Sequence, residues 1–151
     1  MAGWLDNTRT IPDEMIRRGT FYPPVGSRKF FELYRPPSEL PPETVLAHLR
    51  QAVIAVGRQL DDWRANQTAA TLADVPCETV DNISELVILW ERAVYCEAKA
   101  EILRETLTAD RRAAAENAAK TGSETEEKYR EFAADAIAQI RGEARIYVGD
   151  I

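Results

Sequence analysis

The chain has 151 residues, of which 45% are hydrophobic and 29% charged, and its formal net charge is −6. These values are typical of one globular domain, and the absence of a long uncharged apolar run excludes a membrane-spanning helix. The acidic balance argues against a protein whose main task is to grip nucleic acid, because that task needs lysines and arginines that neutralise phosphates.

Residues 1–41 are expected to form an extended arm. Six of the eight prolines lie here, and proline removes a backbone donor and biases the preceding residue to extended conformations. Asp13 to Arg18 has the composition for one or two helical turns. Aromatic side chains in such a segment usually dock on a surface, and here they include Phe21, Tyr22, Phe30, Phe31 and Tyr34. The simpler interpretation is docking on the chain's own helices. The sharper hypothesis is that these residues contact a neighbouring subunit.

Pro42 to about Asn66 is predicted to be the first long helix. Pro42 suits a first turn, and apolar residues up to Trp63 recur at helical spacing. A connection over residues 67–81 follows, in which Leu72 and Val75 are expected to close the end of a helical bundle.

Asn82 to Ala109 is predicted to be the central helix and the largest source of core. Two apolar stripes lie side by side on it and make a face wider than a surface helix needs. Asn82 is expected to cap the first turn, with Glu85 reaching back from the third helical position. Tyr95 and Lys99 are assigned to the remaining, polar side. The core residues expected from all the helices are Trp63, Ile83, Val87, Trp90, Val94, Phe132 and Ile137.

The last helix is expected after a break over residues 110–122, which contain helix formers but no large apolar residue. Ser123 to Glu126 reads as a capping box, and the helix should end near Arg141 with Gly142 in the left-handed cap position. Residues 143–151 are β-branched and aromatic at their centre, which predicts a short extended strand. A lone strand needs backbone partners. It is either solvated, packed along its own bundle, or added to a strand of another chain.

The predicted fold class is therefore all-α. Residues 42–142 form a small bundle of about three to four helices, between the Pro- and aromatic-rich arm of residues 1–41 and the β-prone tail of residues 143–151. The sequence begins with no recognisable signal peptide, so Cys77 and Cys96 are expected to be reduced thiols.

No residue pattern of an enzyme is found: there is no nucleotide-binding loop, hydrolase nucleophile motif, zinc-protease motif or CxxC pair. His48 is the only histidine and has no companion for metal binding or catalysis. Glu97, Glu101 and Glu105 recur every four residues, but a di-metal bundle would also need Glu-x-x-His motifs. A solvated face that pairs with Lys99 and Arg104 is expected instead. No catalytic residue, metal site or cofactor is predicted.

Four stretches in order resemble the head completion, or head stabilisation, proteins of contractile-tailed phages. More distantly, the chain is similar to the helical head–tail connector proteins of other tailed phages. The resemblance covers about residues 21–151, and the stretches that carry it are Phe21 to Pro23, Leu72 to Pro76, Glu91 to Val94, and Arg141 to Ile151.

The resemblance implies a non-catalytic virion protein of the neck, assembled in the host cytoplasm and without a membrane partner. Such proteins bind the portal protein after DNA packaging, form a ring that is expected to be dodecameric, and stabilise the filled head. They present the docking surface for downstream tail-completion proteins, while DNA passes through the ring without sequence-specific binding. By resemblance, the segment that reaches into the portal comprises Arg145, Ile146, Tyr147, Val148 and Ile151. The alternative is a soluble helical interaction module of another system.

Overall fold

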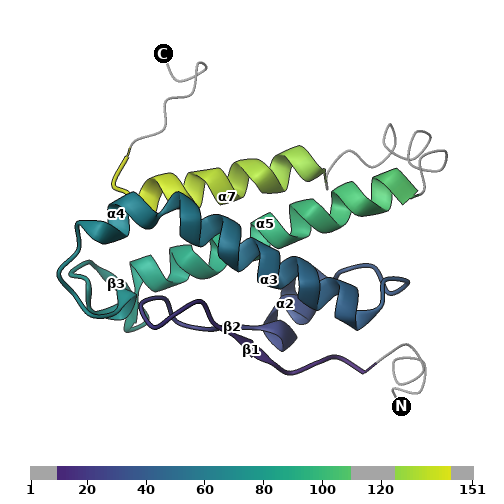
Figure 1. Cartoon of the computed structure of the whole chain (residues 1–151), viewed down its shortest axis with the longest axis horizontal. Helices are drawn as coiled ribbons and strands as arrows, with labels where there is room; N and C mark the ends of the chain where they lie inside the picture. Colours follow the sequence, from purple (N-terminus) through teal and green to yellow (C-terminus); the bar gives the residue numbers. More distant parts are fainter. Residues whose placement is uncertain (1–9, 110–124, 144–151) are drawn as a thin grey trace.

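The computed structural model describes residues 10–109 and 125–143 (Figure 1). The fold is mostly helical, which confirms the predicted small helical bundle. In chain order the elements are β1 (Met15–Ile16), β2 (Val25–Gly26), α2 (Ser27–Tyr34), α3 (Pro42–Gln59), α4 (Asp61–Ala65), a 3-10 turn (Leu72–Asp74), β3 (Thr79–Val80), β4 (Ile83–Ser84), α5 (Glu85–Ala109) and α7 (Glu126–Ile140).

Helix α5 lies in the middle of the fold, with α7 packed along it and α3 crossing it (Figure 1). The 3-10 turn also contacts α5, and Leu72 and Val75 are buried beside it. Buried side chains lie along α5 from Leu86 to Ile102. The central position predicted from the wide apolar face is therefore what the structure shows.

Helix α5 begins three residues later than predicted. Its first turn is capped by Ser84, whose Oγ accepts hydrogen bonds from the backbone N–H groups of Leu86 and Val87 at 3.1 and 3.3 Å. Asn82, the predicted cap, lies instead in the tight turn between β3 and β4. Asp81 and Asn82 both have positive φ values, 53° and 65°, as a two-residue hairpin turn with right-handed strand twist requires.

The predicted first helix is divided in two. Helix α3 ends at Gln59, and the five-residue α4 follows after Leu60. The backbone N–H of Leu60 is shared between the carbonyls of Val56 and Gly57, which tightens the last turn. The side chain of Leu60 is fully buried, so the residue between the two helices still adds to the core.

The arm is not extended throughout. β1 and β2 pair antiparallel, with Met15 opposite Gly26 and Ile16 opposite Val25, so Asp13 to Arg18 contains a strand rather than helical turns. The eight-residue α2 then follows β2 directly. No side chain caps α2, and it is held by burial of Phe30 and Phe31 instead.

Helix α7 begins and ends with local hydrogen bonds. Thr125 Oγ1 accepts from the backbone N–H of Lys128 at 3.1 Å, so the cap lies two residues after the predicted Ser123, which is outside the described residues. At the other end Gly142 has φ 75°. Its N–H donates to Gln139 O, and the N–H of Glu143 donates to Ala138 O. This is a Schellman motif, and the prediction for Gly142 is confirmed.

Most of the residues predicted to form the core do lie in it. Trp90, Val94 and Ile137 are buried, and Trp63 and Val87 are partly buried against them. Phe132 is half-buried and lies under the guanidinium of Arg92. The assignment of Ile83 is wrong, because its side chain is 49% exposed in β4, before the helix begins.

Candidate functional site

The aromatic side chains of the arm lie in the protein's own core. Phe21, Tyr22, Phe30 and Phe31 are buried, and Tyr34 is partly buried. The ring of Tyr22 stacks on Trp90 of α5, with centroids 4.1 Å apart and an interplanar angle of 12°. Docking on the chain's own helices, the simpler of the two interpretations, is therefore what the structure shows. Side chains buried in this way leave a neighbouring subunit almost no surface to contact.

Three polar groups of α5 bind backbone atoms of the arm. Trp90 Nε1 donates to Pro23 O at 3.1 Å. Tyr95 Oη donates to Gly26 O at 2.8 Å and accepts from Gly26 N at 3.1 Å. Lys99 Nζ donates to Tyr34 O at 2.7 Å. Both ends of α2 are thus attached to the central helix.

The side of α5 that the sequence marks as polar is the docking side for the arm. Glu91, Tyr95 and Lys99 follow one another at four-residue spacing and share a helix face. Glu91 binds Lys29 at 2.6 Å, and Tyr95 and Lys99 are buried. Burial raises the pKa of Tyr95 above its usual range, so the phenol stays protonated and able to donate. The predicted solvent exposure of Tyr95 and Lys99 is wrong, because the arm covers them.

The carboxylates of α5 pair with α7 and α3. Arg130 of α7 binds Glu97 at 2.8 Å and also contacts Glu101 and Glu126. Burial alone would lower the pKa of Arg130, but hydrogen bonds to Glu101 and Glu126 raise it overall, so the guanidinium stays charged. Glu101 also lies 4.0 Å from Arg104. The expected partner Arg104 is thus present, whereas Lys99 binds carbonyl groups of the arm instead.

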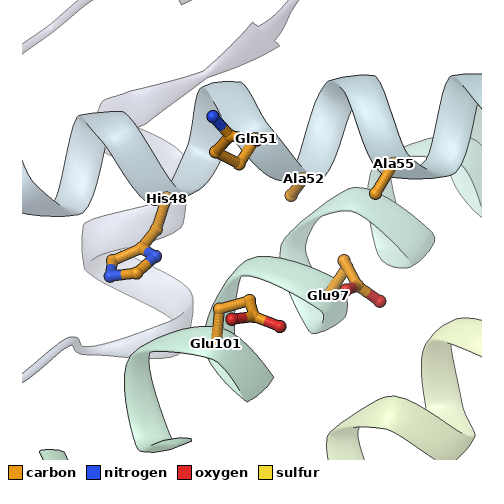
Figure 2. A pocket seen from close by; sticks show the side chains of 6 residues that line it. All are labelled: His48, Gln51, Ala52, Ala55, Glu97 and Glu101. Atoms are coloured by element: carbon orange, nitrogen blue, oxygen red, sulfur yellow. The ribbon is translucent and has the colours of Figure 1, made fainter. Parts of the chain in front are cut away.

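A groove of about 400 Å³ runs between α3 and α5, and Figure 2 shows the side chains that line it. The lining residues are His48, Gln51, Ala52 and Ala55 on α3, and Glu97 and Glu101 on α5. His48 Nε2 lies 2.7 Å from a carboxylate oxygen of Glu105. Ala52 and Ala55 have short side chains, so α3 does not fill the groove. The carboxylates of Glu97 and Glu101 form ion pairs with Arg130. The arrangement joins three helices and aligns no nucleophile with a base.

Within residues 10–109 and 125–143, no group of three or more His, Cys, Asp or Glu side chains could hold a metal ion. No helix in these ranges is long and apolar enough to cross a membrane. Cys77 and Cys96 are both free thiols. Burial raises the pKa of the Cys96 thiol, which lowers its reactivity.

The predicted portal-binding tail lies outside the described residues: Arg145, Ile146, Tyr147, Val148 and Ile151. The structure describes the chain up to Glu143, the last residue of the Schellman motif. The other residues predicted for the site, those of the arm, are brought together on α5 as part of the core.

Within the described residues, the structure is thus a helical protein in which the arm is docked on α5 and the carboxylates of α5 are paired with α7. Residues 16–151 match the model of a family described as phage head completion protein (GPL). The chain is also 26% identical over 154 residues to the head completion/stabilization protein of Escherichia phage P2. The aligned region covers 97% of this chain and 91% of the relative. No solved structure matches.

Because the family model covers nearly the whole chain, the protein belongs to the phage head completion protein family. This is a family of structural phage proteins, and the resemblance stated from the sequence is confirmed. Family membership therefore assigns the chain a role in head completion.

Proposed function

We propose that the protein acts at the portal vertex as a non-catalytic head-to-tail connector. After DNA packaging, copies of the chain bind the portal ring, form a ring of their own that is dodecameric, and close the filled head. The outer side of this ring then receives the tail-completion proteins. The observation that carries the proposal is the family match through residue 151, which includes the segment that resembles a portal-binding tail.

The structure supports this role with a packed body whose last described helix, α7, ends in a defined cap. Trp90, Tyr95 and Lys99 attach the arm to α5, so the described residues form one packed unit. The Schellman motif at Gly142 fixes the direction in which the chain leaves α7. A rigid body that ends in a strand-forming segment suits addition to an edge strand of another chain.

The acidic balance of the chain suits a conduit for DNA. The net charge is −6, and a negative lumen repels phosphates rather than trapping them. DNA would pass such a ring without sequence-specific contacts.

Sedimentation with the portal protein of the same phage tests the proposal. The full-length chain should co-sediment in many copies per portal, whereas a chain that lacks Arg145 to Ile151 should stay in the supernatant. If the full-length chain does not bind, the portal-binding role is wrong and a helical interaction module with another partner takes its place.

A single substitution sharpens this test. Tyr147→Ala should weaken portal binding and leave the free energy of unfolding nearly unchanged, because the proposed tail follows the capped end of α7 in the sequence and is expected to add nothing to the core. Ile54→Ala on α3, which truncates an apolar side chain that is 38% exposed, is the control and should bind as the wild type does. Unfolding of the isolated Tyr147→Ala protein would show that the tail belongs to the core and would contradict strand addition.

A further inference from the structure

The β3–β4 hairpin and the first turn of α5 present aliphatic side chains to solvent. Val80 is 50% and Ile88 38% exposed. Both line a groove of about 170 Å³, whose other walls are Glu85 and Leu89 of α5 and Gln139 of α7. Exposed apolar side chains gathered beside a groove are a common sign of an interaction surface. We call the groove formed by these five residues the hairpin groove.

The described chain ends at the turn of α7 that borders the hairpin groove. Figure 1 shows the end of α7 and the β3–β4 hairpin at the same end of the molecule. Gln139, which lines the groove, lies in the last turn of α7. The N–H of Glu143, the last described residue, donates to the carbonyl of Ala138 in that same turn. Residues 144–151 therefore start from the turn that forms one wall of the groove.

Residues 144–151 are long enough to reach the hairpin groove from any side of α7. At about 3.3 Å per residue, an extended segment of this length spans about 26 Å, whereas a helix with its side chains is about 10–12 Å across. Because the segment is tethered to the body, its local concentration at the groove is on the order of millimolar. A weak contact is therefore enough to populate a docked state.

The sequence of this segment suits the lining of the groove. Ile146, Tyr147 and Val148 are apolar and favour an extended conformation, which fits a groove with aliphatic walls. Arg145 precedes them, and Glu85 in the groove wall is exposed and forms no ion pair with a described residue. An extended segment also needs partners for its backbone, and no described strand besides β3 and β4 belongs to their sheet.

We propose that, before the portal is met, residues 144–151 dock in the hairpin groove of their own chain, with Ile146 to Val148 against Val80 and Ile88. The chain's own tail prevails over that of a second copy, because its local concentration is higher at any protein concentration below the millimolar range. The inference rests on the proposed function, which assigns the same segment to the portal. The groove and the portal therefore compete for one tail, and the tail leaves the groove only when the portal is present.

Amide NMR spectra of the free protein test the docking without any portal. The full-length chain is compared with the chain that lacks Arg145 to Ile151. Loss of the tail should shift the amide resonances of Val80 and Ile88 and speed hydrogen exchange in the hairpin. Changes confined to the residues next to the cut would overturn the inference. So would shifts at the groove that fade when the full-length protein is diluted, because they would come from the tail of a second copy.

Substitutions in the tail give the matched comparison at constant length. Ile146→Ser with Val148→Ser keeps the charge of the tail and should reproduce the shifts at Val80 and Ile88 that truncation causes. Ala144→Ser, in the same segment, should leave both resonances as they are in the wild type. Equal shifts in the control and in the double variant would contradict docking through the apolar residues.

Substitutions in the groove separate this inference from the proposed function. Val80→Ser with Ile88→Ser leaves the tail intact and removes its docking site. If at least half of the molecules are docked, this chain should bind the portal about two-fold or more tightly than the wild type, because no docked state competes. Equal or weaker binding would overturn the competition. If neither chain binds the portal, the proposed function fails, whereas the docking itself is decided by the spectra of the free protein.

Discussion

The described part of the chain contains two short antiparallel hairpins, and each runs directly into a helix. β1 and β2 are joined by residues 17–24 and lead into α2, whereas β3 and β4 are joined by Asp81 and Asn82 and lead into α5. Val25 of the first hairpin is fully buried, while Val80 of the second is 50% exposed. The same local motif thus serves the core in one place and the surface in the other.

The difference lies in what holds each hairpin. The first is held by distant residues: Tyr95 binds both backbone polar groups of Gly26, and Ser27 Oγ donates to Pro12 O. The second is held locally, by its two-residue turn and by the Ser84 cap. A hairpin held by its own turn and by a neighbouring cap can leave its side chains exposed, and the predictions that follow test this contrast.

The largest loss of stability is expected where the first hairpin region meets α5. Trp90 is buried, stacks on Tyr22 and binds Pro23 O. Trp90→Ala should lower the free energy of unfolding by about 3–5 kcal/mol, through lost burial and the cavity left behind. Urea unfolding followed by circular dichroism measures it. A loss of less than about 1 kcal/mol would contradict the central role of this residue.

Removal of the Tyr95 hydroxyl should lower the free energy of unfolding by less than Trp90→Ala does. Tyr95→Phe keeps the ring but leaves Gly26 N and Gly26 O without their partner. We expect a loss of about 1–3 kcal/mol, the range for two hydrogen bonds to partly buried groups. Hydrogen exchange should show faster exchange of the Gly26 amide. Unchanged protection of that amide would mean that the hydroxyl does not hold the arm.

A matched pair of substitutions compares the two hairpins directly. Val25→Thr places a hydroxyl in the core and should cost about 1–3 kcal/mol. Val80→Thr makes the same change on the surface and should stay within about 0.5 kcal/mol. Thermal unfolding of both variants measures the difference. Equal losses would show that the second hairpin is as tightly coupled to the core as the first.

The buried phenols should have the smallest effect on the free energy of unfolding at neutral pH, because they change stability only at alkaline pH. Burial raises the pKa of Tyr22, Tyr34 and Tyr95 above the usual value. The unfolded chain therefore loses these protons first, so the contribution of these phenols to stability is constant below about pH 10 and falls as pH rises further. Urea titrations from neutral to alkaline pH measure this fall. The Tyr95→Phe protein should show a shallower alkaline slope, and an unchanged slope would contradict the assignment.

Helical periodicity was enough to predict the long helices. Apolar residues at three- and four-residue spacing marked α3, α5 and α7, because each buries one broad stripe against another helix. The cap at Gly142 was also predictable, since only a residue tolerant of positive φ suits that position.

The arm could not be predicted in the same way, because its structure depends on contacts far along the chain. Helix α2 has no capping side chain and lies between prolines, and it is attached by Tyr95 and Lys99. These two residues look like surface residues in sequence because their partners are backbone atoms. The cap at Ser84 was not predicted for a local reason. Asn82 has a side chain suited to helix capping, but its backbone forms the turn between β3 and β4.

The buried ammonium group of Lys99 offers a direct view of the arm during assembly. It is 3% exposed and directed at Tyr34 O, so an acylating reagent can reach it only when the arm lifts from α5. The rate of acylation at Lys99, compared with that at the exposed Lys128, therefore measures how often the arm opens. A slower rate in filled heads than in the free protein would show that incorporation into the virion clamps the arm shut.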